Sequence, residues 1–190
     1  MREGVRQAYT AIAEHPQEDP PFPTGRELAA ALGYSPELLD ELPGVAVEAF
    51  AGVSCVSLFA EVPRGASVLD LGCGAGLDTL IAARRVGRAG QVIGVDFSEA
   101  MLRRARQALA EAGATQVELR QGDAERLPLK DASVEIALVN GILNLNPARQ
   151  EILCELARVL QPGGTAYLAE LVLQEPLSEE ERSRPASWFT

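Results

Sequence analysis

The sequence predicts an α/β fold in which a doubly wound, mostly parallel sheet carries helices on both faces and follows an N-terminal helical lid. Two observations favour this class. From Ser67 onward, short apolar runs alternate with amphipathic stretches, as in strands that are joined by helices. The preceding residues look helical or irregular and carry no strand signal. At 190 residues, the chain has room for one such domain and a small appendage.

The lid is expected to contain four helical segments that are separated by turn signals. Thr24 with Glu27 can form a capping box, and Ser35-Pro36 supplies an N-cap followed by proline at the first helical position. The most apolar of the four segments is expected to form a buried or lid-like helix. In chain order the segments are residues 2–13, 24–33, 35–43 and 45–60.

The core is expected to contain five strands. The first, second and fourth are almost continuously apolar, which suits a parallel sheet covered on both faces. Ser98 can cap a helix that ends at Gly113, and Asn146-Pro147 can start another that Pro162-Gly163-Gly164 ends. The strands are predicted at residues 67–71, 91–95, 117–121, 134–139 and 165–172. We therefore divide the chain into a helical cap (residues 1–62), a ligand-binding core (63–175) and a tail (176–190).

Composition narrows the class of partner. The net charge of −10 argues against a nucleic-acid backbone or an anionic membrane surface as the main partner. No stretch is apolar and long enough to suggest a membrane span, and the N-terminus does not read as a signal peptide. The three cysteines are odd in number and widely spaced, and we interpret them as reduced thiols in a cytoplasmic protein. A small molecule or another protein is left as the partner.

A glycine-rich turn, Asp70-Leu71-Gly72-Cys73-Gly74-Ala75-Gly76, directly follows the first predicted strand. Its G-x-G-x-G spacing differs from the G-x-G-x-x-G of nicotinamide and flavin enzymes. Glycines allow a tight turn and let a ligand reach main-chain amides. The acid at the strand end would repel a pyrophosphate, but it suits a ligand with an ammonium group. The alternative is a purely structural turn between strand and helix.

Two further acids follow the second and third strands. Asp96 lies twenty residues past Gly76, where a carboxylate can accept hydrogen bonds from both hydroxyls of a ribose. The alternative for Asp96 is a helix-initiating role, since Ser98 follows. Asp123 can accept a hydrogen bond from the exocyclic amine of an adenine. Phe97 and Met101 would flank that adenine, although either could belong to the core.

These motifs, in this order, resemble the class I S-adenosylmethionine-dependent methyltransferases. The resemblance covers roughly residues 65–173 and rests on residues 68–76, 92–101, 122–128, 134–140 and 160–164. It implies a Rossmann-like, seven-stranded sheet with S-adenosylmethionine as cofactor and S-adenosylhomocysteine as product. It places Asp70 near the ammonium group of the cofactor, Asp96 on the ribose, and Asn140 at the pocket floor. The remaining cofactor contacts that it implies are Gly72, Cys73, Gly74 and Gly76 beneath the methionine, and Phe97, Met101, Asp123 and Ala124 around the adenine.

Within that family, residues 76–78, 82–84 and 140–144 look like the arsenite methyltransferases and the quinone C-methylating enzymes. The sequence departs from the arsenite enzymes, which carry cysteines in the N-terminal region and just after the fourth strand. Here the latter position is Gly141, and no cysteine precedes residue 50. Trivalent arsenic needs converging thiolates, so we do not expect arsenite as the acceptor.

The residues that face the methyl acceptor are harder to predict. Methyl transfer from a sulfonium requires attack geometry and exclusion of water, and needs no dedicated acid or base when the acceptor is a thiol, an activated carbon or an amine. The catalytic residues are therefore left open, with Tyr9, Tyr34, Asn140 and Asn144 as candidates, and Asn146 is expected to be an N-cap. His15 is the only histidine, so no metal site is expected. The alternative functions are a non-catalytic S-adenosylmethionine-binding or regulatory module and, less favoured by the glycine spacing, a nicotinamide-dependent oxidoreductase.

The tail is short for this family, which normally adds two antiparallel strands after the fifth. Only seventeen residues follow residue 173, and Trp188-Phe189 would be costly to leave exposed. We expect residues 176–190 to be the start of a truncated segment. The alternative is a homodimer in which a partner subunit covers the sheet edge.

Overall fold

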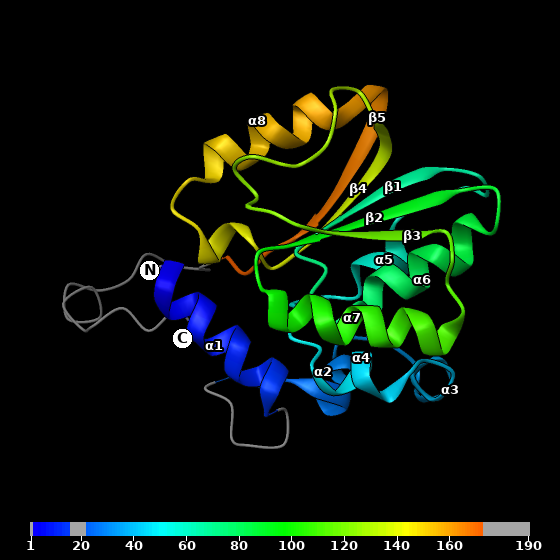
Figure 1. Ribbon diagram of the computed structural model, residues 1–190, viewed down its shortest axis with the longest axis vertical. Helices are drawn as coiled ribbons and strands as arrows, with labels where there is room; N and C mark the ends of the chain where they lie inside the picture. The colour runs from blue at the N-terminus through cyan, green and yellow to red at the C-terminus, as the bar shows by residue number, and fades with distance from the viewer. Residues whose placement is uncertain (1, 16–21, 173–190) are drawn as a thin grey trace.

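The computed structural model of the chain describes residues 2–15 and 22–172 (Figure 1). Its centre is a five-stranded sheet in the order β3-β2-β1-β4-β5, and every neighbouring pair of strands is parallel. The predicted fold class is therefore confirmed. The strands are β1 (Ser67–Leu71), β2 (Gln91–Asp96), β3 (Val117–Gln121), β4 (Val134–Asn140) and β5 (Leu160–Ala169).

Helices cover both faces of this sheet. The connections from β1 to β2 and from β2 to β3 run through α6 (Leu77–Val86) and α7 (Glu99–Ala112), which lie on one face. The connection from β4 to β5 runs through α8 (Arg149–Val159), which lies on the other face (Figure 1). Strand order therefore reverses between β1 and β4. In such sheets, ligands bind beyond the carboxyl ends of the strands at this point.

The alternation of side chains along each strand supplies both faces with apolar groups. On one face, Leu69 and Val139 pack with Ile152 and Leu156 of α8. On the other face, Val68 and Leu138 pack against α6 and α5 (Val56–Phe59). Burial on both sides explains why the central strands are mostly apolar, with Asp70 in β1 and Glu135 in β4 as exceptions.

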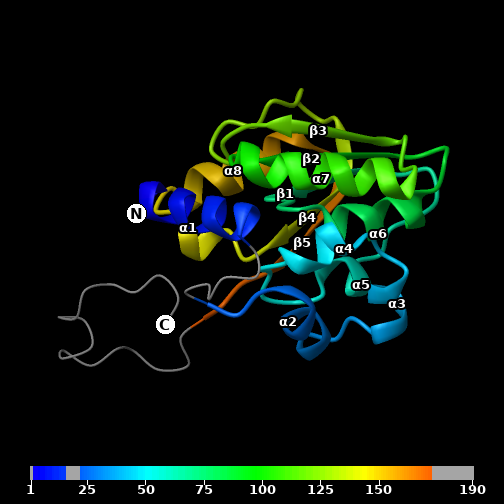
Figure 2. The ribbon, with the colours of Figure 1, turned by 60° about the horizontal axis from the view of Figure 1, so that its bottom comes forward.

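The N-terminal helices pack on the outside of α6 and α7. Tyr34 and Leu39 join a buried cluster with Leu80 of α6 and Ala108 of α7, and Figure 2 shows α2, α3 and α4 together below the sheet, with α1 apart from them at its left. Arg104 of α7 donates hydrogen bonds to the carbonyls of α1 and α4 residues and pairs with Glu48 at 2.9 Å. The helices are α1 (Arg2–Glu14), α2 (Gly25–Ala31), α3 (Pro36–Asp40) and α4 (Gly44–Glu48).

Several predicted element boundaries are wrong. The helix expected over residues 45–60 is two short helices, α4 and α5, separated by an irregular segment. The fifth strand begins at Leu160, because a register shift between Val134 and Ile136 lets the Pro162-Gly163-Gly164 stretch run inside β5. Asn146 is not the N-cap of α8, which begins at Arg149; instead its side chain accepts a hydrogen bond from Ala148 N in the preceding turn.

Two predicted caps differ in outcome. Ser98 caps α7 as expected and accepts a hydrogen bond from Met101 N at 3.3 Å. Thr24 is the N-cap residue of α2, but its side chain makes no capping hydrogen bond. The expected tail, with Trp188 and Phe189, lies outside the described residues. Over the described parts of the chain, no helix combines the length and apolarity that a bilayer crossing requires.

The central strands should dominate the free energy of unfolding. Leu69 is fully buried in β1, so Leu69→Ala should lower that free energy by about 2–5 kcal/mol. Leu153 of α8 is 48% exposed, so the matched Leu153→Ala change should stay within about 0.5 kcal/mol. Urea denaturation of both variants tests this, and equal losses would contradict the core assignment.

Candidate functional site

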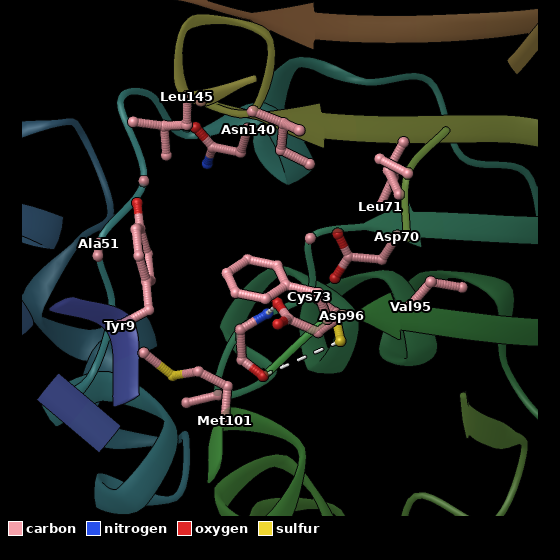
Figure 3. Close-up of a pocket in the computed structure, with 18 of the residues that line it drawn as sticks. Tyr9, Ala51, Asp70, Leu71, Cys73, Val95, Asp96, Met101, Asn140 and Leu145 are labelled. Carbon is pink, nitrogen blue, oxygen red and sulfur yellow. Dashed lines mark hydrogen bonds between the residues drawn. The ribbon is translucent and has the colours of Figure 1, made fainter. Parts of the chain in front are cut away.

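A cavity opens beyond the carboxyl ends of the strands, at the switch point between β1 and β4. The glycine turn and the end of β2 form its floor, and residues from α1 and from the segment after α4 close it from the opposite side. Figure 3 shows Tyr9, Ala51, Leu145 and Asn140 around one end of this space, with Asp70, Asp96 and Met101 around the other.

The glycine turn is held against the end of β2. Gly72 N and Cys73 N donate to Val95 O at 2.7 and 3.1 Å, and Gly74 N donates to an Asp96 carboxylate oxygen at 2.9 Å. Gly72 and Gly74 both have positive φ angles, +73° and +51°, which glycine adopts without strain. A Cβ at Gly74 would meet nothing within 4 Å, so the main chain there is open to a ligand.

Gly76 has a different place from the one expected. It is the N-cap residue of α6 and does not line the cavity. Its φ is +93°, and an added Cβ would lie 3.4 Å from the Cβ of Ala105 in α7. Gly76 therefore lets the chain turn into α6 in close contact with α7.

Asp96 is fixed by main-chain donors at the end of β2. One oxygen accepts from Ser98 N at 2.7 Å and the other from Gly74 N at 2.9 Å. Burial raises the pKa of Asp96 to about 6, against the lowering effect of these hydrogen bonds. Since each carboxylate oxygen can accept twice, both retain capacity toward the cavity.

Asp70 and Asp78 are two further buried carboxyl groups of the cavity wall. Burial, followed by the nearby negative charge of Asp78, raises the pKa of Asp70 to about 7, and Thr79 Oγ1 donates a hydrogen bond to it. Burial also raises the pKa of Asp78, which accepts hydrogen bonds from Tyr34, Ser57 and Asn140. All three of these donors are uncharged, so hydrogen bonds alone stabilise this carboxyl group.

The Asn140 side chain lines the cavity, but its polar atoms are fully used. Its Oδ1 accepts from Val53 N and Ser54 N at 2.8 and 3.1 Å. Its Nδ2 donates to Ser54 O at 2.7 Å and to Asp78 at 2.9 Å. Asn140 therefore clamps the segment after α4 onto the end of β4.

Two candidates for the acceptor side lie elsewhere. Tyr34 is 1% exposed and does not line the cavity; its hydroxyl donates to Asp78 at 2.6 Å. Asn144 does not line the cavity either, and its side chain donates to Leu171 O at 2.5 Å. Tyr34 and Asn144 do not line the cavity as expected, because each side chain is held by a hydrogen-bond partner that is distant in the sequence.

Tyr9 does line the cavity. Its ring meets Phe97 edge-on, with centroids 6.5 Å apart, and packs on Phe22 at 5.6 Å. Burial, then the negative charges of Asp96 and Glu170, raises the pKa of Tyr9, so its phenol stays protonated at neutral pH. Met101 of α7 also lines the cavity, as do Asp123 and Ala124 beyond β3.

Sequence reasoning did not select several lining residues. Asp78 lies in the first turn of α6, and a polar residue buried directly after a glycine turn is the signal that could have drawn attention to it. Ala51, Gly52, Ile142 and Leu145 line the acceptor end without any motif to mark them.

The three cysteines do not share one site. Cys73 lines the cavity, and burial raises the pKa of its thiol; Cys55 is half-buried and Cys154 is exposed on α8. Among the described residues, no group of three or more His, Cys, Asp or Glu side chains is arranged to hold a metal ion.

A parallel sheet with a glycine turn after β1 and an acid after β2 is typical of α/β domains that bind a nucleoside cofactor. The chain belongs to the methyltransferase domain family, whose model matches residues 63–188. It is 35% identical over 205 residues to an arsenite methyltransferase of Halobacterium salinarum, covering 98% of this chain and 51% of that one. It is 40% identical over 106 residues to a demethylmenaquinone methyltransferase of Lactococcus lactis, covering 56% and 42%.

The structure is similar to that of an arsenic(III) S-adenosylmethionine methyltransferase from Chlamydomonas reinhardtii. The TM-score is 0.65 at 31% identity, covering 87% of this chain and 54% of that one. The chain thus spans about half the length of the relatives that it matches. The predicted family and fold are confirmed, and with them S-adenosylmethionine as the cofactor to consider for this site.

The raised pKa of Asp70 predicts a pH-dependent stability. In the unfolded chain the pKa of this carboxyl group is near its ordinary value of 3.8, whereas in the folded chain its pKa is about 7. Its neutral form therefore stabilises the fold fully below about pH 4, and this contribution is lost as the pH rises through about 7. Between pH 5 and 8, the wild-type protein should lose roughly 2 kcal/mol relative to Asp70→Asn.

Urea denaturation across this pH range measures the difference between the two proteins. Glu151→Gln, the equivalent change at an exposed site on α8, is the control and should follow the wild-type curve. Parallel curves for the wild type and Asp70→Asn would contradict the pKa shift.

Proposed function

We propose that the protein binds S-adenosylmethionine in this cavity and transfers its methyl group to a small-molecule acceptor. The observation that carries the proposal is the pair of buried acids, Asp70 and Asp96, on either side of an open glycine turn. A carboxylate beyond β1 suits the ammonium group of the cofactor, and one beyond β2 suits its ribose hydroxyls. Family membership supports the same reaction class.

The residues present fit this cofactor. The main chain of Gly72, Cys73 and Gly74 would lie beneath the methionine portion, where Gly74 leaves space for close approach. The ribose would lie against Asp96, whose orientation is set by Ser98 N and Gly74 N. The adenine would lie among Phe97, Met101, Asp123 and Ala124. Gly76 is not part of this proposed set, since it does not line the cavity.

For this reaction, the positioning of donor and acceptor by the protein matters more than proton transfer by its side chains. S-adenosylmethionine supplies a methyl group on a positively charged sulfur, which is displaced in line by the acceptor atom. The chain's own part is to orient both molecules and to exclude water. Asn140 and Asp78 contribute by holding the segment after α4 over the cavity, and Tyr9 contributes a protonated phenol.

The names of two relatives, an arsenite methyltransferase and a demethylmenaquinone methyltransferase, suggest arsenite and demethylmenaquinone as acceptors to consider. Arsenite held by protein thiolates needs several converging cysteines, and Cys73 alone of the three lines this cavity. We therefore do not propose arsenite as the acceptor.

We further propose that residues 1–62 act as a cap over the core of residues 63–175. The hydrogen bonds from Val53 and Ser54 to Asn140 support this division of roles. The unpaired thiols favour a reducing, cytoplasmic environment.

A second copy of the chain is the protein partner that we propose, because β5 pairs only with β4 in the described sheet and Phe59 and Leu168 are exposed beside it.

Calorimetric titration with S-adenosylmethionine tests the cofactor assignment. Asp96→Asn should weaken binding by about 1.5–3 kcal/mol, roughly 10- to 150-fold in Kd, because a charged acceptor of hydrogen bonds is lost. Asp131→Asn is the same exchange in the loop before β4, at the amino-terminal ends of the parallel strands and away from the cavity. It should leave the Kd unchanged.

Three results would count against the proposal. Absence of binding by the wild-type chain would exclude the cofactor, and binding of a reduced nicotinamide in its place would favour an oxidoreductase. Binding of S-adenosylmethionine without S-adenosylhomocysteine formation across thioethers, thiols, quinones and amines would favour a non-catalytic module.

A further inference from the structure

The acceptor end of the cavity is formed mainly by apolar groups. Beyond the donor end, where Asp70 and Asp96 lie, the apolar part of the wall includes Tyr9, Ala51, Ile142 and Leu145, with the side chain of Asn140 beside them. Figure 3 shows the Tyr9 ring, Ala51 and Leu145 on one side of the open space and Asn140 above it. An acceptor at this end would therefore have an apolar body.

At this end Asn140 and Asp78 make hydrogen bonds within the protein, and Tyr9 is protonated. Asn140 uses both of its polar atoms on Val53, Ser54 and Asp78. Asp78 accepts hydrogen bonds from Tyr34, Ser57 and Asn140. Tyr9 keeps its proton at neutral pH. The described cavity wall contains no histidine and no lysine.

The charge of the cavity wall is a second constraint on the charge of the acceptor, separate from the hydrogen bonds described above. Five carboxyl groups line it, from Asp70, Asp78, Asp96, Asp123 and Glu125. The described wall offers a single cationic side chain, Arg6, whose guanidinium lies 5.8 Å from the centre of the Phe97 ring. When these carboxyl groups are ionised, such a cavity stabilises cations and disfavours an anionic nucleophile, because carboxylates outnumber the one cation in its wall.

We propose that the acceptor is an uncharged molecule whose attacking atom carries a lone pair and no proton, such as a neutral thioether or selenoether. This inference rests on the proposed methyl transfer. The lone pair forms the new bond to the methyl carbon as the carbon–sulfur bond of the donor breaks. The electron pair of that bond stays on the donor sulfur, and the positive charge passes to the acceptor. The product is a sulfonium or selenonium cation, and no proton leaves.

Acceptors that must first lose a proton fit this cavity poorly. A phenol, a thiol or a carbon acid would react as an oxyanion, a thiolate or an enolate beside the buried carboxyl groups of Asp70 and Asp78. The carboxyl groups of the described wall can accept the proton, but the remaining carboxylates would repel the anion that forms, and the one cation of that wall, Arg6, lies at the Phe97 ring. A neutral acceptor creates no such anion, and the sign of its cationic product is opposite to that of these carboxylates.

Matched probes with a common phenyl body test the inference. Methyl phenyl sulfide and methyl phenyl selenide carry no ionisable proton, whereas thiophenol and hydroquinone must ionise. The full chain is incubated with each probe and methyl-labelled S-adenosylmethionine at pH 7.5, while calorimetry on the same preparation measures cofactor binding. Label should appear in the sulfonium or selenonium product with a rate enhancement over the uncatalysed reaction at least tenfold greater than that for thiophenol or hydroquinone.

A binding measurement tests the charge argument without turnover. With S-adenosylhomocysteine present, dimethyl(phenyl)sulfonium should bind at least tenfold more tightly than isopropylbenzene, which has the same shape and no charge. Equal affinity, or tighter binding of the hydrocarbon, would overturn the charge argument.

The outcomes separate this inference from the function on which it rests. A chain that fails to bind S-adenosylmethionine contradicts the proposed function itself. A chain that binds it and methylates thiophenol or hydroquinone in preference to the sulfide and selenide overturns only the inference. Binding of the cofactor with no transfer to either neutral probe overturns the inference as well.

Discussion

The structure depends on the burial of three carboxyl groups, Asp70, Asp78 and Asp96, at one edge of a parallel sheet. The described residues include no buried cation to balance them, and their partners are amides and hydroxyls. Burying charge without a counter-ion is costly, and two of the groups respond with pKa values of about 6 and about 7. A cationic ligand beside them would recover part of that cost. A sulfonium with an ammonium group has the required charge.

The same carboxyl groups connect the cap to the core. Asp78 joins Tyr34 and Ser57 of the N-terminal region to Asn140 at the end of β4. Asn140 then fixes the segment that forms the wall opposite the glycine turn. The wall of the cavity therefore depends on one hydrogen-bonded cluster, whereas the glycine turn of the floor is held by Val95 O and Asp96.

The parts of the structure that were predictable follow from local physical chemistry. The bounds of β1 and β3 agree with those predicted, and Ser98 caps α7 because its side chain needs only a donor three residues away. The glycine turn and Asp96 were found because spacing along the chain marks them. By contrast, Tyr34 pairs with a residue 44 positions away, and the bonds of Asn140 to Val53 and Ser54 span 87 and 86. Long-range pairs of this kind account for the errors at Tyr34 and in the expected helix over residues 45–60, and for the hydrogen bonds of Asn140, which lines the cavity as predicted.

A crystal structure of the chain with S-adenosylhomocysteine tests the account most directly. The account predicts that the ribose hydroxyls lie within hydrogen-bond distance of Asp96. The amino group should lie toward Asp70, and the sulfur should face the apolar end that Tyr9 and Leu145 enclose. A ligand bound elsewhere, or in this cavity with its ribose away from Asp96, would contradict the account.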